Sequence, residues 1–143
     1  MRTQKFKFLE HTADVKFQAF GSTLEKAFSN SALALAEVMT KKTKIKSKIK
    51  KEIKVSGKDN SRLLYNFLEE FLFLFDSEGF ILSKIEKLNI KEDRKIKLEA
   101  EVSGDNVKNY KISQDVKAIT YNSMFVKKDK KTKKFIIQVV LDV

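Results

Sequence analysis

The sequence predicts an α+β protein in which two helices pack on one face of a largely antiparallel β-sheet. Two segments, 24–39 and 63–75, carry apolar residues three and four positions apart, as amphipathic helices do. Several other segments alternate apolar and polar residues with a period of two, which is typical of strands with one buried face. The order of these segments, with most strands in one run after the second helix, favours antiparallel pairing.

The first third of the chain is expected to contain two strands and a helix. Residues 6–8 and 15–19 alternate apolar with polar side chains, so each segment predicts a strand. Gly21 ends the second strand, and the helix follows it. Ser22 and Glu25 have the spacing of a capping box, in which the serine hydroxyl accepts a backbone N–H and the glutamate reaches back. The helix is therefore expected to begin at Ser22.

The middle of the chain predicts a strand and a second, more buried helix. Residues 41–54 are rich in lysine, and the alternation within 51–55 predicts a strand. The lysines before this strand fit a solvated loop or edge better than an RNA-binding arm. The helix over 63–75 has a broad apolar face, an N-cap is expected within 59–61, and Gly79 suits the left-handed position after the last turn.

The second half of the chain predicts a series of strands. Clean alternation over 96–102 indicates a strand with one wet face, and residues 81–90 are expected to form one strand or two. Residues 104–114 are expected to form a loop. The remaining strands are expected over 115–121, 124–128 and 135–141. No repeat or linker divides the sequence, so residues 1–143 are expected to form a single domain.

The composition favours a soluble, cytoplasmic protein with no membrane segment. The chain has 143 residues, no cysteine and one histidine, and no apolar run is long enough to cross a bilayer. Its formal net charge of +11 permits contact with tRNA or another polyanion through the lysine-rich segments. Nearly all of this charge comes from lysine, whereas arginine is the side chain that clamps phosphates and reads guanine. The charge therefore permits RNA binding without indicating it.

A polar stretch between the first two strands, residues 10–14 (EHTAD), is the candidate functional site. The last strand ends at Asp142 and Val143, and the alternation of that strand points the Asp142 side chain away from the core. If the two segments meet, their carboxylates repel each other unless a proton, a lysine or a divalent cation offsets the charge. Oxygen ligands favour Mg²⁺, Ca²⁺ or Mn²⁺, and one histidine without cysteine nearly excludes a closed zinc site.

The residues alone leave other interpretations open. Asp14 could simply shape a turn by a hydrogen bond from its side chain to its own backbone. In that interpretation Asp142 is a solvated terminal residue, and His11 is a structural residue that forms a hydrogen bond. A metal-dependent phosphoesterase-like enzyme would use His11 and Asp14 for catalysis. A basic RNA-binding or chaperone-like module would use the lysines instead.

Five segments of the chain together resemble the archease family. They are residues 10–14 (EHTAD), 21–28 (GSTLEKAF), the second helix with its ending 74–79 (LFDSEG), 116–121 (VKAITY) and 140–143 (VLDV). Each segment is modestly specific, but they fall in the family's order and span nearly the whole chain. The resemblance implies an archease-like α+β fold.

The same resemblance implies a role and a set of site residues. Archeases activate the RtcB-type RNA ligase of tRNA splicing and RNA repair: they promote GTP-dependent guanylylation of the ligase histidine and multiple turnover, and they are not ligases themselves. The implied metal ligands are Asp14, Asp142 and Val143. Lys117 stands at the position of a functionally important lysine, and Glu10 and His11 lie next to the ligands as possible supporting residues.

Two positions depart from the family pattern. Asn122 stands where the family usually has a histidine, so no proton-transfer or metal role is expected of it. Asp115 stands where glutamate is common. The implied cofactor is thus a divalent ion held by oxygen atoms, Ca²⁺, Mg²⁺ or Mn²⁺, and the implied partner is the RNA ligase.

Overall fold

The computed structural model describes residues 4–10 and 14–143. This part of the chain contains two helices, seven strands and a short 3₁₀ helix over Val107–Asn109. The helices are α1 (Leu24–Thr40) and α2 (Asn60–Glu78). The strands are β1 (Phe6–Leu9), β2 (Val15–Gly21), β3 (Ile49–Gly57), β4 (Phe80–Glu92), β5 (Ile96–Asn106), β6 (Ala118–Lys128) and β7 (Phe135–Asp142).

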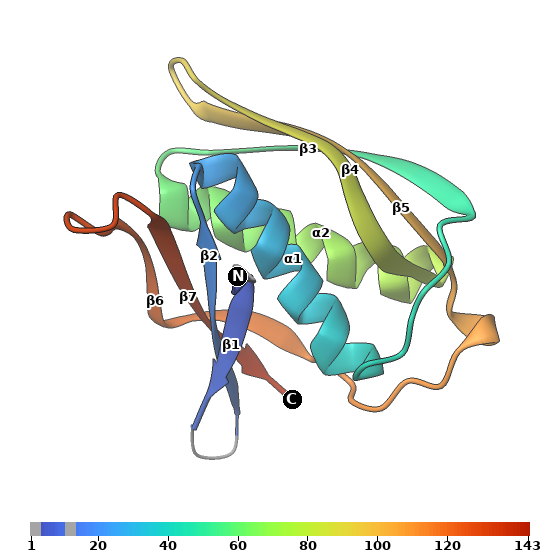
Figure 1. Ribbon diagram of the computed structural model, residues 1–143. Coiled ribbons are helices and arrows are strands. Elements are labelled where there is room, and N and C mark those ends of the chain that lie inside the picture. Colours follow the sequence, from blue (N-terminus) through green and yellow to red (C-terminus); the bar gives the residue numbers. More distant parts are fainter. Residues whose placement is uncertain (1–3, 11–13) are drawn as a thin grey trace.

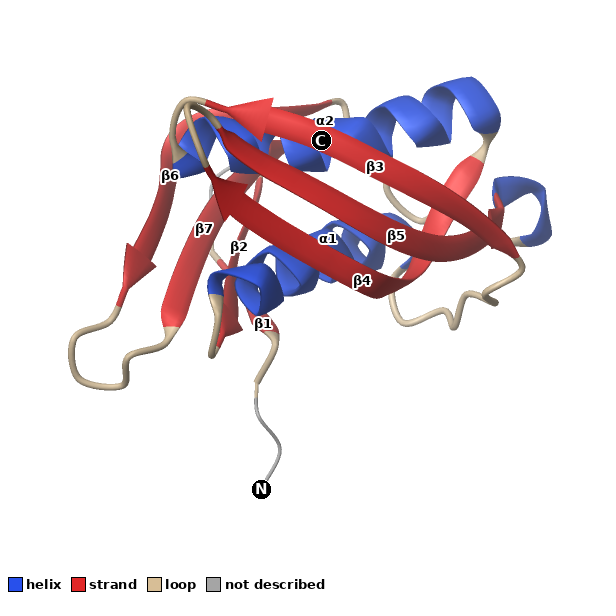
Figure 2. Cartoon of the chain, turned by 90° about the horizontal axis from the view of Figure 1, so that it is seen from above, coloured by secondary structure: helices blue, strands red, loops and turns tan. Residues whose placement is uncertain are grey.

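The strands form two antiparallel sheets, and the two helices lie between them (Figure 1, Figure 2). One sheet has the order β1-β2-β7-β6 and the other β3-β5-β4. α1 packs on β2 and β4, and α2 packs on β6 and β3, so each helix contacts both sheets. The α+β class and the antiparallel pairing are confirmed. The division into two sheets was not expected, because alternation indicates which side chains face inward but not which strands pair.

Local signals set the ends of both helices. The N-cap of α1 is Thr23, whose hydroxyl accepts a first-turn N–H at 3.1 Å. The predicted cap at Ser22 is therefore wrong by one residue, and Ser22 lies in the bend between β2 and the cap. Asp59 caps α2 by accepting a first-turn N–H at 2.8 Å. Gly79 ends α2 with a φ of 64°, as predicted.

The core lies between the helices and the inward faces of both sheets. Phe28 of α1 and Phe67 of α2 are fully buried, and their ring centroids lie 5.9 Å apart. Phe17 of β2 and Leu98 of β5 are fully buried too and extend the core to the two sheets. Removing a buried phenylalanine from such a core costs about 3–5 kcal/mol. This packing fixes the positions of the strands whose ends carry the candidate site.

The C-terminal strands are longer than the sequence indicated. β4 is one strand of 13 residues with two irregularities in its pairing with β5, and β5 continues to Asn106, inside the expected loop. β6 joins the two strands expected on either side of Asn122 and Ser123. Its register with β7 shifts there, and Ser123 has a φ of 56°. The irregularity lets the strand bend without ending, so polar residues in this segment do not mark a turn.

Candidate functional site

Asp14 and Asp142 lie at the same end of the four-stranded sheet. β2 and β7 are antiparallel neighbours in a register that pairs Val15 with Leu141. Asp14 directly precedes Val15, and Asp142 directly follows Leu141, so this register places the two aspartates across from each other. Figure 1 shows the end of β7 close to the start of β2. The structure thus brings together the two segments that were expected to meet.

Lys117 reaches the same end from the other side of β7. Ala118, the first residue of β6, pairs with Asp142. The backbone N–H of Lys117 donates to the carbonyl oxygen of Asp142 at 2.8 Å. The residues Lys117 and Asp142 are both exposed. Three neighbouring strand ends therefore bring Asp14, Asp142 and Lys117 into one region of the sheet.

The backbone around Asp142 is held by burial on both sides. Leu141 is fully buried, and Val143 is half-buried and packs against the core. Asp142 between them is exposed, as the sequence predicted. A carboxylate whose neighbours are anchored in a core keeps a defined position, which favours binding of a ligand.

The oxygen atoms at this sheet end suit a hard cation. Asp14 and Asp142 offer side-chain carboxylates, Val143 adds main-chain oxygen, and such ligands suit Ca²⁺, Mg²⁺ and Mn²⁺. Within residues 4–10 and 14–143, no three His, Cys, Asp or Glu side chains are grouped to hold a metal. Among the residues that the structure describes, a cation here would therefore take main-chain oxygens, water or a partner's ligands besides the two aspartates. His11 lies outside the described residues.

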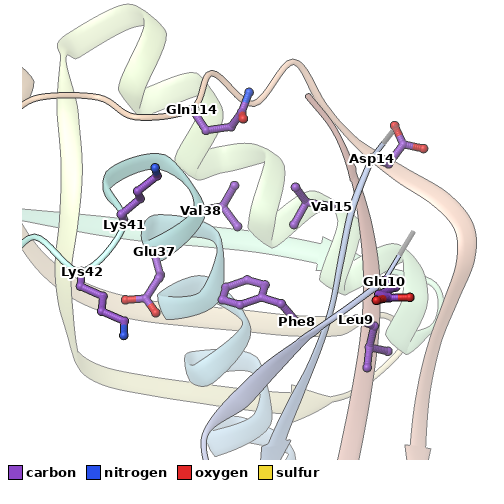
Figure 3. A pocket seen from close by; sticks show the side chains of 10 residues that line it. All are labelled: Phe8, Leu9, Glu10, Asp14, Val15, Glu37, Val38, Lys41, Lys42 and Gln114. Atoms are coloured by element: carbon purple, nitrogen blue, oxygen red, sulfur yellow. The ribbon is translucent and has the colours of Figure 1, made fainter. Parts of the chain in front are cut away.

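An open hollow of about 1270 Å³ lies beside this end of the sheet (Figure 3). Glu10 and Asp14 stand on one side of it, Lys41 and Lys42 stand on the other, and apolar side chains lie between them. Glu10 is exposed and lines the same hollow as Asp14. The sequence did not reveal the hollow, because alternation predicts that Phe8 is buried, whereas it is 45% exposed.

The two departures from the family pattern lie on or just before β6. Asp115 is exposed in the segment that leads to this strand. Asn122 is exposed where β6 loses its register with β7. Its neighbour Tyr121 stacks on Tyr65 of α2 with ring centroids 4.4 Å apart, and Arg62 donates to the Tyr121 hydroxyl at 2.8 Å. Asn122 thus adjoins an aromatic contact between β6 and α2, four residues along the strand from the partner of Asp142.

A further carboxylate, Asp105, was missed by sequence analysis. It is only 3% exposed and accepts hydrogen bonds from the Tyr110 hydroxyl at 2.6 Å and the Asn106 N–H at 2.8 Å. The hydrogen bond from Tyr110 is the main reason that the pKa of Asp105 lies below its ordinary value. The Tyr110 hydroxyl itself accepts the backbone N–H of Lys46 at 2.9 Å. This network joins two loops, so we interpret Asp105 as a structural residue.

Comparisons with known proteins agree with the fold and with the motifs. Residues 6–143 match the model of the Archease protein family (MTH1598/TM1083). Protein archease of Sulfurisphaera tokodaii is 39% identical over 142 residues, which cover 98% of this chain and 99% of that protein. Protein archease of Thermococcus kodakarensis is 39% identical over 127 residues, which cover 87% of this chain and 89% of that protein.

A solved structure supports the same relationship. The solution structure of Methanobacterium thermoautotrophicum protein 1598 matches this chain with a TM-score of 0.84 and 32% identity, over 97% of this chain and 99% of that one. The fold defines a small α+β protein with two helices between two antiparallel sheets. The chain belongs to the archease family. Among the described residues, no helix combines the length and apolarity needed to cross a membrane.

Proposed function

We propose that this archease activates an RtcB-type RNA ligase in the cytoplasm, in tRNA splicing and RNA repair. It promotes the GTP-dependent guanylylation of the ligase histidine and supports multiple turnover, and it acts as a protein activator and not as an enzyme. The observation that carries the proposal is the meeting of Asp14, Asp142 and Lys117 at three neighbouring strand ends in a chain of this family.

The three strand ends have distinct proposed roles. Asp14, Asp142 and the main-chain carboxyl group of Val143 would hold a divalent ion, which supplies positive charge next to a nucleotide phosphate. Lys117 steadies the carboxylates or contacts a phosphate, since an ammonium group is a compact point charge on a flexible stem. Asp142 is exposed at the end of its strand, so it is accessible to a partner protein.

Single-turnover guanylylation of a cognate ligase tests the proposal. The guanylylated fraction is measured with and without this protein, GTP and a divalent ion being present in both reactions. We expect the native chain to raise that fraction and Asp14→Ala to fail, because the substitution removes one carboxylate from the site. Asp93→Ala is the matched control, since Asp93 is an exposed aspartate in the turn between β4 and β5. Full activation by Asp14→Ala would refute the assignment.

A second variant tests the main-chain carboxyl group. A short polar extension fused after Val143 converts this carboxylate into a neutral amide. We expect the extended protein to keep its thermal stability but to activate the ligase poorly. Equal activation by the extended and native proteins would remove Val143 from the proposed ligand set. Ligase-independent phosphoesterase turnover by the native chain would contradict the role as an activator.

A further inference from the structure

The edge strand β1 has backbone groups that point away from the sheet. In the order β1-β2-β7-β6, β1 pairs with β2 alone within the described residues. The Lys5 carbonyl accepts the Phe20 N–H at 2.8 Å, and the register then pairs Phe6 with Ala19. Hydrogen-bonded and non-hydrogen-bonded pairs alternate in an antiparallel ladder, so the N–H and C=O groups of Phe6 and Phe8 face outward.

The side chains of these two residues face a groove. Phe6 and Phe8 lie opposite Ala19 and Phe17, which are fully buried, so all four are on the core face of the sheet. Phe8 nevertheless remains 45% exposed. In Figure 3 its ring points into the hollow beside Val38 of α1.

A second hollow continues the first along β1. It has a volume of about 960 Å³, and its lining residues include Phe6 of β1 and Leu33 of α1. Glu37 and Lys41 line both hollows, so the two adjoin at the C-terminal half of α1, and residues 43–47 and 82–84 also line the second. We refer to the two hollows together as the groove. The outward backbone groups of β1 thus border a groove with apolar walls.

The rim of this groove is mostly positive. The lysines that line it are Lys5, Lys41, Lys42, Lys44, Lys46 and Lys84. The acidic lining residues are Glu37 near the middle, and Glu10 and Asp14 at the end next to the functional site. Among the lysines, Lys84 has an ion-pair partner at 3.2 Å, Glu86. The rim therefore complements an acidic ligand.

We propose that β1 binds an extended, acidic segment of a partner protein, which adds to the sheet as a strand. Backbone hydrogen bonds to Phe6 and Phe8 supply affinity, and alternating side chains supply specificity. Apolar side chains on one face of the segment cover Phe8, and acidic ones on the other face lie beside Lys5 and Lys7. The rim lysines, Lys41 and Lys42 among them, attract the segment through its overall negative charge. A second copy of this chain is disfavoured, because its own β1 would place Lys5 and Lys7 against the same lysines.

A synthetic peptide tests this inference without any ligase, so the result is independent of the proposed activation. The probe is a fluorescein-labelled peptide of about ten residues that alternates valine and glutamate. This length is enough for one strand, because a typical strand has about half as many residues. We expect saturable binding to the full chain by fluorescence anisotropy. A valine–lysine peptide, and a valine–glutamate peptide N-methylated along one backbone edge, are each expected to bind at least about tenfold more weakly. Equal binding of the N-methylated peptide would overturn the proposal.

Two variants with matched controls locate the binding surface. Phe8→Asp and the pair Lys41→Glu/Lys42→Glu are each expected to weaken binding about tenfold. Phe73→Asp is the control for the first, because Phe73 is 57% exposed on α2. Lys130→Glu/Lys131→Glu is the control for the second, since these exposed lysines lie between β6 and β7 and change the net charge equally. Equal losses in variants and controls would contradict a groove on β1.

Hydrogen exchange gives a readout at the strand itself. Binding of the peptide should slow amide exchange at Phe6 and Phe8, whose N–H groups face outward. Binding without protection at these two amides would overturn the added-strand geometry. A single-stranded oligonucleotide is the competing ligand. The groove is a nucleic-acid surface, and the proposal fails, if the oligonucleotide binds more tightly than the peptide and shows one pattern in the variants. In that pattern its affinity falls in Lys41→Glu/Lys42→Glu and is unchanged in Phe8→Asp.

Discussion

Asp105 and Asp142 are carboxylates in opposite surroundings. Asp105 is buried, and its oxygens accept hydrogen bonds from the Tyr110 hydroxyl, the Asn106 N–H and the Asn109 side chain. Asp142 is exposed at the end of β7, beside Lys117 and across from Asp14. The fold uses the first carboxylate to hold loops together and presents the second at the surface. Removing Asp105 should therefore affect stability, whereas removing Asp142 should affect function.

The largest expected effect is on ligase activation by Asp142→Ala. Loss of a residue that only supports a metal ligand already costs about 10- to 100-fold in metal affinity or activity, so we expect a decrease at least that large in the rate of ligase guanylylation. The melting temperature should change by no more than about 2 °C, because Asp142 is exposed and its backbone pairing with Ala118 remains. Thermal unfolding and single-turnover guanylylation are measured on the same preparation. A large loss of stability would mean that the carboxylate has a structural role.

Asp105→Ala should give the reverse result. The substitution leaves the Tyr110 hydroxyl and the Asn106 N–H without their acceptor in a buried site, so we expect the melting temperature to fall by roughly 5–10 °C. Ligase activation measured well below that temperature should be retained. Asp93→Ala serves again as the control for a lost aspartate. If Asp105→Ala abolished activation while remaining folded, the separation between the two carboxylates would be wrong.

The smallest expected effect is a pH dependence that Tyr110→Phe removes. The Tyr110 hydroxyl stabilises the ionised form of Asp105 and lowers its pKa below the ordinary value of 3.8. This stabilisation is therefore present above about pH 3.8 and is lost as the pH falls through the lower pKa of the folded state. We expect the native chain to be more stable than Tyr110→Phe near neutral pH, and the difference to shrink in acid. An equal difference at all pH values, by denaturant unfolding, would contradict this assignment.

Much of the site was predictable from the sequence, since its signals are local. Alternation placed Asp14 before one strand and Asp142 at the end of another, and a family resemblance suggested that these ends meet. Gly79 marked the end of α2 because a left-handed residue is needed there. The division into two sheets and the contact of Asp105 with Tyr110 depend on long-range pairing and loop paths, which no local pattern contains. Phe8 lies on the core face, as alternation predicts, yet it is exposed, because alternation does not show how far other elements cover an edge strand.

Manganese binding followed by NMR tests the central claim most directly. Mn²⁺ added in small steps to the ¹⁵N-labelled full chain broadens the amide signals nearest to the ion, and Asp105 serves as an internal control. We predict that signals around Asp14, Ala118 and Asp142 broaden first, that those of Asp105 and Tyr110 stay sharp, and that Asp142→Ala removes the effect. Broadening that starts elsewhere, or that is unchanged in Asp142→Ala, would contradict a cation site at these strand ends.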